Sequence, residues 1–493
     1  MLLQQHHDAG TAAPYRWRWV ALITLLVAEA MNLLDATVVT VAAPVIHADL
    51  GGATSDIQWF GAAYTLPFAV LLIAGGRLGD LVGRRRVFAV GIIGFTAMSV
   101  VCALAPDAGF LIGARAVQGA AAALVVPQTI GMIRAMFSGD EMARAMGTIG
   151  PVMGLSAVLG PVLGAVLTRA DLLGSSWRPV FLVNVLPAAF VLATLPLLPG
   201  PAATSGGHQS DAGRGRRLSG LDGTGTALAV VALTLIVYPL VQGGAAGWPA
   251  WSWAELAAGC ALVAVFGLHQ RHRDRAGRLP LVEASLFRDR RFPAALVTST
   301  LFFAAMNGLM VVVVLQVQLG QGRGVLSAGL TVLPWSAAMG VASLVAGVRL
   351  VPRHGSSVMF LGLAVMAAGL LGAVAAYHSA RPQGFPWLLL PALAAAGAGT
   401  GLFTVPFFTT ALSRVRPHET GSAAGLINAV QQVGTTLGTA VLGTVFLGRV
   451  DGADPAGGAL TGAQLAFCLG AALLAATAAT AALMLAREPA PAG

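Results

Sequence analysis

The sequence predicts an all-α integral membrane protein with fourteen transmembrane helices. Of its 493 residues, 56% are hydrophobic and only 10% are charged, whereas soluble domains carry about a quarter charged residues. The charges are concentrated in short segments between long apolar runs. A helix needs about twenty apolar residues to cross the hydrocarbon core of a bilayer. Lipid is therefore the expected solvent for most of the chain.

Fourteen apolar runs follow one another in groups of six, two and six. The first six are residues 19–44, 58–78, 87–105, 110–137, 146–167 and 180–198. The two central runs are 223–242 and 253–268, and the last six are 292–319, 327–350, 358–377, 387–412, 423–447 and 464–486. This grouping predicts an N-terminal six-helix region over 1–198, linkers with two extra helices over 199–291, and a C-terminal six-helix region over 292–493.

The basic residues test this count independently. All 29 are arginines; with the N-terminus inside, 23 fall in cytoplasmic segments or at the cytoplasmic ends of spans, five in outer loops and one, Arg115, well inside a span. This bias follows the positive-inside rule. It supports the number of spans and predicts a multi-pass protein of the bacterial cytoplasmic membrane with both termini in the cytoplasm. The arginines that set the membrane topology therefore account for the net charge of +9, and no nucleic-acid partner is expected.

Two segments are predicted to be linkers. Residues 199–218 are rich in Gly, Ser, Pro and Ala, which is typical of a mobile strand of chain. Residues 270–291 are rich in arginine and are expected to lie along the anionic inner leaflet. Simple topological anchoring accounts for both segments, and a regulatory role is the alternative.

The loop after the second span has the ordered pattern G-x-L-G-D-x-x-G-R-R-R over residues 76–86. Its glycines permit a very tight turn between two helices, and its acid is flanked by arginines. The pattern resembles the signature of the major facilitator superfamily. The residues that carry this gating motif are Gly76, Arg77, Gly79, Asp80, Gly83, Arg84 and Arg85.

The resemblance extends over nearly the whole chain. Residues 34–44 are similar to the first-helix motif of the fourteen-helix drug:proton antiporters, the QacA- and EmrB-like exporters, although Thr40 and Ala43 depart from the usual residues. The fifth span is similar to the antiporter motif of that family through Gly150, Pro151, Gly154, Gly160, Pro161 and Gly164. The resemblance implies two pseudo-symmetric six-helix bundles with two extra central helices between them.

Asp35 and Arg115 are ionisable groups inside apolar spans. Such groups are costly in a membrane and are functional by default. Since a guanidinium cannot be neutralised, Arg115 needs an acceptor, and Asp35 is the candidate partner. The resemblance favours a role for both in proton coupling; the alternatives are a packing hydrogen bond for Asp35 and a static buried ion pair for Arg115.

Glu29 lies six residues before Asp35, about 240° around an ideal helix, so the two carboxyl groups are not expected to share a face. Glu29 is a candidate second protonation site or a contact for a cationic substrate. A pore-lining residue of no great consequence is the alternative.

The resemblance also predicts two gates. Small residues in the fifth span allow close helix approach, and the family relationship implies that this seam closes the outer end of the pathway. Asp80 is expected to face the start of the thirteenth span near Gly421, where the helix dipole would stabilise a carboxylate. That contact would favour the outward-open state.

Five amide side chains are candidates for a substrate cavity. Packing hydrogen bonds between helices explain such residues equally well. They are Gln58, Gln118, Asn307, Asn428 and Gln431.

The function that the resemblance implies is proton-coupled antiport, with export of small lipophilic drugs or secondary metabolites by alternating access and a consequent role in antibiotic resistance. The sequence contains no G-x-x-x-x-G-K motif, so we expect no ATP-driven export by this chain. It also lacks HExxH, GxSxG and paired catalytic carboxylates, and its three cysteines are far apart. We therefore expect no enzyme activity, no catalytic residues, no metal and no cofactor.

Two other functions stay open at this point. One is ion-coupled uptake or symport of another small solute, against which the fifth-span motif argues; the other is a non-transporting membrane sensor or scaffold. The expected partners are a small lipophilic substrate, protons and the bilayer, with the chain acting as a monomer. Two intramembrane acids suit a cationic substrate, but neutral or weakly acidic antibiotics fit almost as well.

Overall fold

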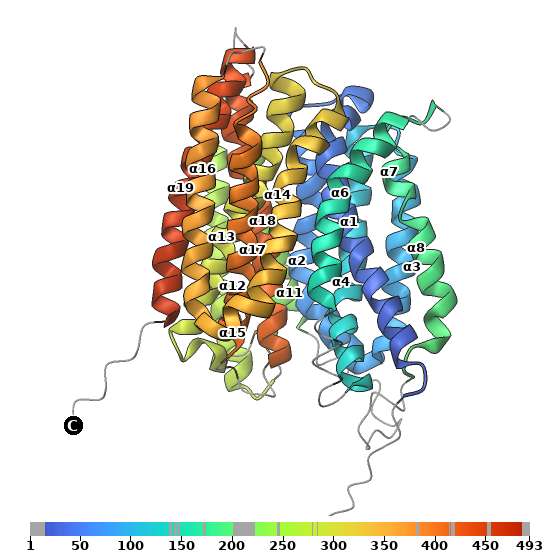
Figure 1. Cartoon of the computed structure of the whole chain (residues 1–493). Helices are drawn as coiled ribbons and strands as arrows, with labels where there is room; N and C mark the ends of the chain where they lie inside the picture. Colours follow the sequence, from blue (N-terminus) through green and yellow to red (C-terminus); the bar gives the residue numbers. More distant parts are fainter. Residues whose placement is uncertain are drawn as a thin grey trace, which may run out of the picture.

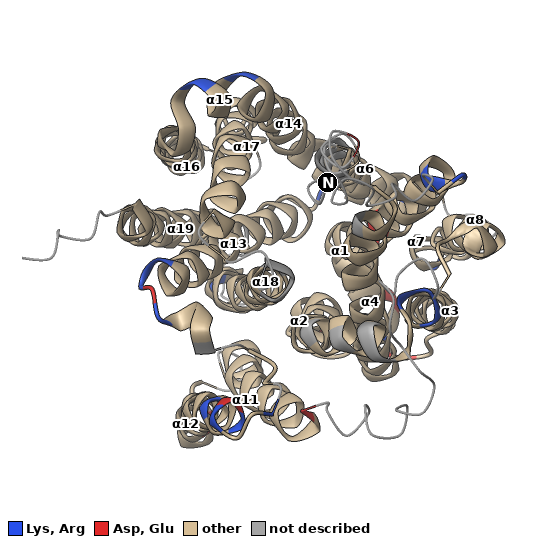
Figure 2. Cartoon of the chain, turned by 90° about the horizontal axis from the view of Figure 1, so that it is seen from below, with Lys and Arg blue, Asp and Glu red and all other residues tan. Residues whose placement is uncertain are grey.

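The computed structural model describes residues 15–137, 141, 145, 148–170, 174–200, 222–243, 247–278, 280–282, 284–380, 384–413, 415, 420–450 and 455–485. All regular secondary structure in these residues is helical, and the long helices run along one common direction (Figure 1). They form two bundles and a separate helical hairpin, seen end-on in Figure 2. The all-α membrane fold predicted from the sequence is confirmed.

The N-terminal bundle is held together by close contacts between glycines and neighbouring backbones. Gly75 of α2 faces the Ala123 carbonyl of α4, and Gly119 of α4 faces the Tyr64 carbonyl of α2, so a side chain at either glycine would overlap the partner helix. The described helices of this bundle are α1 (Arg18–Leu50), α2 (Asp56–Val82), α3 (Arg84–Ala103), α4 (Ala108–Met136), α6 (Ile149–Ala170), α7 (Pro179–Leu182) and α8 (Val185–Thr194).

The C-terminal bundle uses the same packing device. Gly308 and Gly438 bring α13 and α18 together, while Gly362 and Gly399 do so for α16 and α17. Close approach through small residues is the usual basis of helix association in lipid. The described helices are α13 (Arg291–Leu315), α14 (Val325–Val345), α15 (Val351–His354), α16 (Val358–Ser379), α17 (Leu389–Leu412), α18 (Thr420–Val450) and α19 (Pro455–Leu485).

The two extra helices, α11 (Gly223–Gln242) and α12 (Ala250–Arg275), pair with each other as a hairpin. Gly259 of α12 packs on Ala232 and Ile236 of α11. Figure 2 shows α11 beside α2 and α18, and α12 on its outer side. The hairpin therefore lies where the two bundles meet.

Each of the fourteen predicted spans coincides with a helix or a run of consecutive helices. Eleven helical stretches in the described residues are long and apolar enough to cross a membrane, and one of them, Val325–Ser379, contains both α14 and α16. The sixth span is interrupted at Val183 and Asn184, between α7 and α8. The predicted linker start at residue 270 is wrong, because α12 continues to Arg275; most of the other predicted linker, 199–218, lies outside the described residues.

The arginine-bearing helix ends define the two ends of the molecule. The starts of α1, α3 and α13 and the end of α12 carry Arg18, Arg84, Arg291 and Arg275 and lie at the lower end in Figure 1. We call this the arginine-rich end and the other the opposite end.

Three contacts join the bundles from the middle of the spans to the opposite end. The hydroxyls of Thr65 and Thr436 are hydrogen-bonded at 2.6 Å, and α6 packs on α14, where a Cβ at Gly329 would lie 2.9 Å from the Pro161 carbonyl oxygen. Nearer the opposite end, Gln318 Nε2 donates to the Val41 carbonyl at 2.8 Å. These contacts join the two bundles at the opposite end.

Candidate functional site

The central feature of the N-terminal bundle is an ion pair between α1 and α4. Arg115 donates through NH1 to Asp35 Oδ2 at 2.5 Å, and the side chains of Arg115 and Asp35 are only 1% and 0% exposed. Arg115 Nε also donates to the Phe60 carbonyl at 3.0 Å. The predicted partnership of Asp35 and Arg115 is therefore present as a buried salt bridge. Breaking such a pair leaves an uncompensated charge and costs about 3–5 kcal/mol.

The second oxygen of Asp35 is held by two amides. Asn184 Nδ2 donates to Oδ1 at 2.7 Å and Gln118 Nε2 at 3.1 Å. Both amides also donate to Ser99 Oγ, at 3.3 and 2.9 Å. The carboxylate is thus held directly by groups from α4 and the α7–α8 break, and Ser99 of α3 accepts from both amides.

Aromatic rings cover the guanidinium of Arg115. Its Cζ lies 4.4 Å from the ring centre of Tyr64 and 5.7 Å from that of Phe181. Cation–π attraction strengthens when the cation is removed from water. The network of Asp35, Arg115, Gln118, Asn184 and Ser99, which we call the coupling network, is therefore overall neutral and sealed from solvent.

Glu29 has a very different environment from Asp35. Its Oε2 is buried without a hydrogen-bond partner among the described residues, and the same holds for both amide atoms of Asn32 on the same helix and for the hydroxyl of Tyr64. Buried polar groups are normally hydrogen-bonded, so unpartnered groups call for an explanation. These three side chains retain capacity to bind a proton, water or a polar substrate group.

The antiporter motif lies on α6 and forms two packing surfaces. Gly160 and Gly164 approach α1: a Cβ at Gly160 would overlap the Thr37 side chain, and one at Gly164 would lie 2.8 Å from the Val38 carbonyl oxygen. Pro161 faces α14, as described above. The backbones of Gly150, Pro151 and Gly154 belong to α6, but their side-chain surroundings lie outside the described part of the structure.

The gating motif forms the tight turn between α2 and α3. Gly83 has φ +107°, a conformation that side-chain-bearing residues rarely adopt. Gly79 packs on Gln128 of α4, and Arg84 lies against Gly131 of the same helix. Arg85 NH1 is 3.5 Å from the Leu198 carbonyl. These contacts fix the turn to α4 and to the end of the sixth span.

The remaining residues of the gating motif are Gly76, Arg77 and Asp80. Gly76 belongs to α2, where a Cβ would meet Pro127 at 3.4 Å. The side chains of Arg77 and Asp80, and the surroundings of Gly421, lie outside the described residues. The predicted contact of Asp80 with α18 therefore stays a prediction.

The five candidate cavity amides separate into distinct environments. Gln118 belongs to the coupling network, and Gln58 lies at the α2–α18 contact, 3.5 Å from the Thr444 hydroxyl. Asn307 donates to Phe303 O at 3.1 Å and to Thr435 Oγ1 at 3.0 Å, so it links α13 to α18. Asn428 and Gln431 are half-buried on α18. Packing thus accounts for Gln58 and Asn307, the alternative that the sequence left open.

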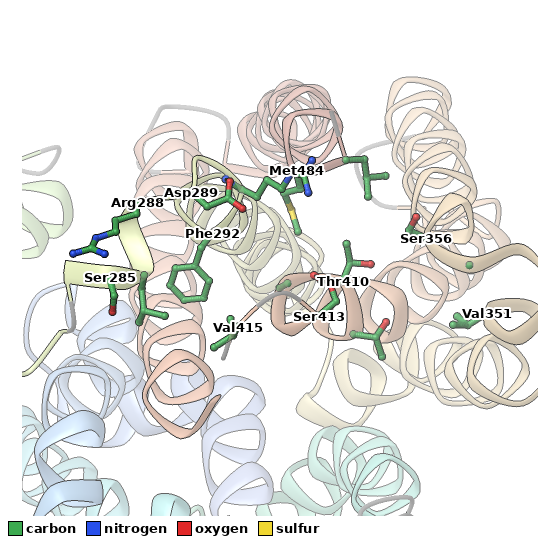
Figure 3. A pocket seen from close by; sticks show the side chains of 16 residues that line it. Ser285, Arg288, Asp289, Phe292, Val351, Ser356, Thr410, Ser413, Val415 and Met484 are labelled. Carbon is green, nitrogen blue, oxygen red and sulfur yellow. Dashed lines mark hydrogen bonds between the residues drawn. The ribbon is translucent and has the colours of Figure 1, made fainter. Parts of the chain in front are cut away.

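A cavity of about 620 Å³ opens at the arginine-rich end of the C-terminal bundle. Ser285, Phe292, Thr410 and Ser413 surround it, with Arg288 and Asp289 at one side (Figure 3). Its lining comes from the ends of C-terminal helices and includes none of the candidate site residues. It is therefore separate from the coupling network.

Sequence comparison finds relatives across most of the chain. The "probable actinorhodin transporter" of Streptomyces coelicolor is 42% identical over 443 residues, which cover 89% of this chain and 75% of the relative. The puromycin resistance protein of Streptomyces alboniger is 33% identical, and the match covers 90% of this chain and 84% of that relative. The cephamycin export protein of Amycolatopsis lactamdurans is 34% identical, with 86% and 84% covered.

Solved structures share the fold at low identity. A crystal structure of tetrameric PepTSo2 matches with a TM-score of 0.67 and 16% identity, covering 95% of this chain and 98% of that chain. The xylose transporter XylE of E. coli matches with a TM-score of 0.62 and 12% identity, covering 96% and 100%. The family model described as Major Facilitator Superfamily matches residues 25–439. The chain therefore belongs to the major facilitator superfamily.

Proposed function

We propose that this protein is a proton-coupled antiporter that exports small lipophilic antibiotics or drugs across the cytoplasmic membrane. The names of three relatives, which concern actinorhodin transport, puromycin resistance and cephamycin export, support the substrate class. The observation that carries proton coupling is the Asp35–Arg115 pair, which is buried within apolar helices and in which Asp35 accepts from three side-chain donors.

Protonation of Asp35 would remove one charge from a sealed pair and leave the Arg115 guanidinium uncompensated. A buried charge without a partner is unstable by several kcal/mol. The protonated state must therefore rearrange α1 against α4, and a rearrangement at the centre of the bundle can drive the change between inward- and outward-facing states. Glu29 offers a second acid on the same helix, either for a proton or for a cationic substrate.

The arginine-rich end faces the cytoplasm in this proposal, in agreement with the positive-inside rule. The bundle contacts at the opposite end then close the path toward the outside. Substrate would be taken up from the cytoplasm or inner leaflet in this state, and opening of the α2–α18 and α6–α14 seams would release it outside.

Everted membrane vesicles test the proposal. We expect an imposed proton gradient to drive uptake of an exported antibiotic into the vesicles, an uncoupler to abolish it, and Asp35→Asn to reduce it to the level of vesicles without the protein. A panel that includes puromycin and cephamycin-type compounds identifies the substrate used. Uncoupler-sensitive accumulation in whole cells would instead establish uptake, and an unchanged resistance phenotype of Asp35→Asn would favour a sensor or scaffold.

A further inference from the structure

The hairpin of α11 and α12 is positioned on the seam between the two bundles. Val237 and Val241 of α11 form one buried apolar cluster with Ala62 and Leu66 of α2 and Ala440 of α18. Five side chains from three helices thus share a common core. An accessory pair of helices that only filled space in the lipid would have no reason to contact both bundles at their moving boundary.

The last turn of α11 is also hydrogen-bonded to both bundles. Ser55 Oγ, at the start of α2, donates to Gln242 Oε1 at 3.0 Å. Thr444 Oγ1 of α18 donates to the Leu240 carbonyl at 2.9 Å. Carbonyls in the last turn of a helix lack intrahelical donors, so Thr444 satisfies an acceptor that α11 itself leaves open.

An aromatic contact adds to the attachment on the α2 side. The rings of Trp59 on α2 and Tyr238 on α11 lie 6.0 Å apart, and Tyr238 lies 5.9 Å from Trp251 of α12. Such pairs contribute about 0.5–1.5 kcal/mol beyond the area they bury. At the opposite end of the molecule, the hairpin is therefore attached to α2 and α18 together.

At the arginine-rich end, the hairpin is tied to the segment that leads into the C-terminal bundle. Asp222, before the first turn of α11, accepts from the Gly225 amide at 2.8 Å and from Gln270 Nε2 at 2.7 Å. Gln270 Oε1 accepts in turn from the Leu281 amide at 2.7 Å. His269 Nε2 lies 2.9 Å from the Asp222 carboxylate. We call these residues the Asp222 clamp.

We propose that α11 is a movable component of the outer gate. In the closed state α11 seals the α2–α18 seam. When that seam opens, α11 separates from α2 and moves together with the C-terminal bundle. The direction follows from the asymmetry of the attachments. The Asp222 clamp ties the hairpin to the segment that leads into the C-terminal bundle, and Thr444 ties it to α18. The contacts with α2, through Ser55, Trp59, Ala62 and Leu66, lie toward the opposite end and are absent from the described residues of the Asp222 clamp. The inference rests on the alternating access of the proposed function.

Distances between spin labels test the direction of movement. Leu104 after α3, Trp253 on α12 and Trp387 before α17 are all largely exposed, at 72%, 60% and 72%, so each tolerates a labelled cysteine. The exposed Cys260 and Cys468 are replaced beforehand, and buried Cys102 is kept. Addition of an exported antibiotic to the reconstituted protein is expected to change the 104–387 and 104–253 distances together, with 253–387 constant.

The outcomes separate the two proposals. If the 104–387 distance changes while the 104–253 distance stays constant, the hairpin moves with the N-terminal bundle, and the assignment of α11 to the gate is overturned. If 104–387 does not change, the rocking of the bundles fails, and with it the proposed function.

Cross-linking gives a functional measurement of the same gate. A short bis-thiol reagent across Ser55→Cys and Gln242→Cys is expected to stop export, whereas the matched pair Leu240→Cys and Thr444→Cys is expected to leave most export intact. The pair Thr65→Cys and Thr436→Cys, which joins the bundles directly, is the positive control for rocking. Full export by the protein cross-linked between Ser55→Cys and Gln242→Cys would overturn the proposal, provided the positive control is blocked.

Discussion

Asp35 and Glu29 lie on the same helix, but the side chains around them give them different capacities. Asp35 is held in a fixed geometry by the Arg115, Gln118 and Asn184 side chains, whereas Oε2 of Glu29 has no partner among the described residues. A fully bonded carboxylate suits a switch that changes state only with a rearrangement. An unpartnered carboxylate suits a group that binds a proton or a polar group of the substrate.

Glu29→Gln separates the two roles left open for this residue. The substitution removes the negative charge and keeps the shape, so we expect export of a cationic dye to fall by at least about tenfold, equivalent to 1.4 kcal/mol of lost binding, with neutral substrates little affected. Drug efflux from cells that express each variant measures this, and Glu29→Asp is the charge-retaining control. Equal loss for cationic and neutral compounds would instead assign Glu29 to proton coupling.

Two members of the coupling network were not identified from the sequence as site residues. They are Asn184 and Ser99. Both are polar residues within otherwise apolar runs, which is the signal that could have found them. Their connection to Asp35 depends on how α3 and the α7–α8 break pack on α1, and a single sequence does not specify that packing.

The glycines of α6 allow this helix to pack directly against α1. Gly164→Ala would place a Cβ 2.8 Å from the Val38 carbonyl oxygen of α1, and overpacking of this kind typically costs about 1–3 kcal/mol. We expect a lower melting temperature and reduced export. The matched control is Gly340→Ala on α14, where a Cβ meets nothing within 4 Å. Equal melting temperatures for the two variants would contradict the tight α1–α6 seam.

The Asp222 clamp gives the hairpin a pH-dependent stability. Burial raises the pKa of Asp222, but hydrogen bonds from His269, the Gly225 amide and Gln270, together with the charge of Arg273, outweigh burial and hold the pKa below its ordinary value of 3.8. The stabilisation is therefore complete above pH 3.8 and is lost as the pH falls through the lowered pKa.

Asp222→Asn is consequently expected to lower the melting temperature at pH 7. The difference in melting temperature between the variant and the unmodified protein should shrink below pH 3.8. Thermal unfolding in detergent as a function of pH measures both effects. Asp107→Asn, at the exposed N-terminal cap of α4, is the control and should change little, because Asn caps a helix about as well as Asp. A constant difference across the pH range would contradict a charge-based role of the clamp.

The orientation of the whole molecule is a separate prediction. With the arginine-rich end in the cytoplasm, a membrane-impermeant thiol reagent should label Leu104→Cys and Trp387→Cys in intact cells, because both positions lie at the opposite end. Ala276→Cys, just after the end of α12, should react only after the cells are opened. The parent protein without Cys260 and Cys468 supplies the background, and the reverse labelling pattern would invert the proposed direction of transport.

The sequence by itself determined the membrane class, the positions of the fourteen spans and the family, because hydropathy, arginine distribution and short glycine motifs are local properties of the chain. It also predicted that Arg115 would need Asp35, since a buried guanidinium requires an acceptor. Only the tertiary structure decided that Asn184 and Ser99 complete that site, that Gln58 and Asn307 serve helix packing, and that α11 contacts both α2 and α18. These features depend on which faces of distant helices meet, and apolar helices in lipid have little in their own periodicity to mark the face that turns inward.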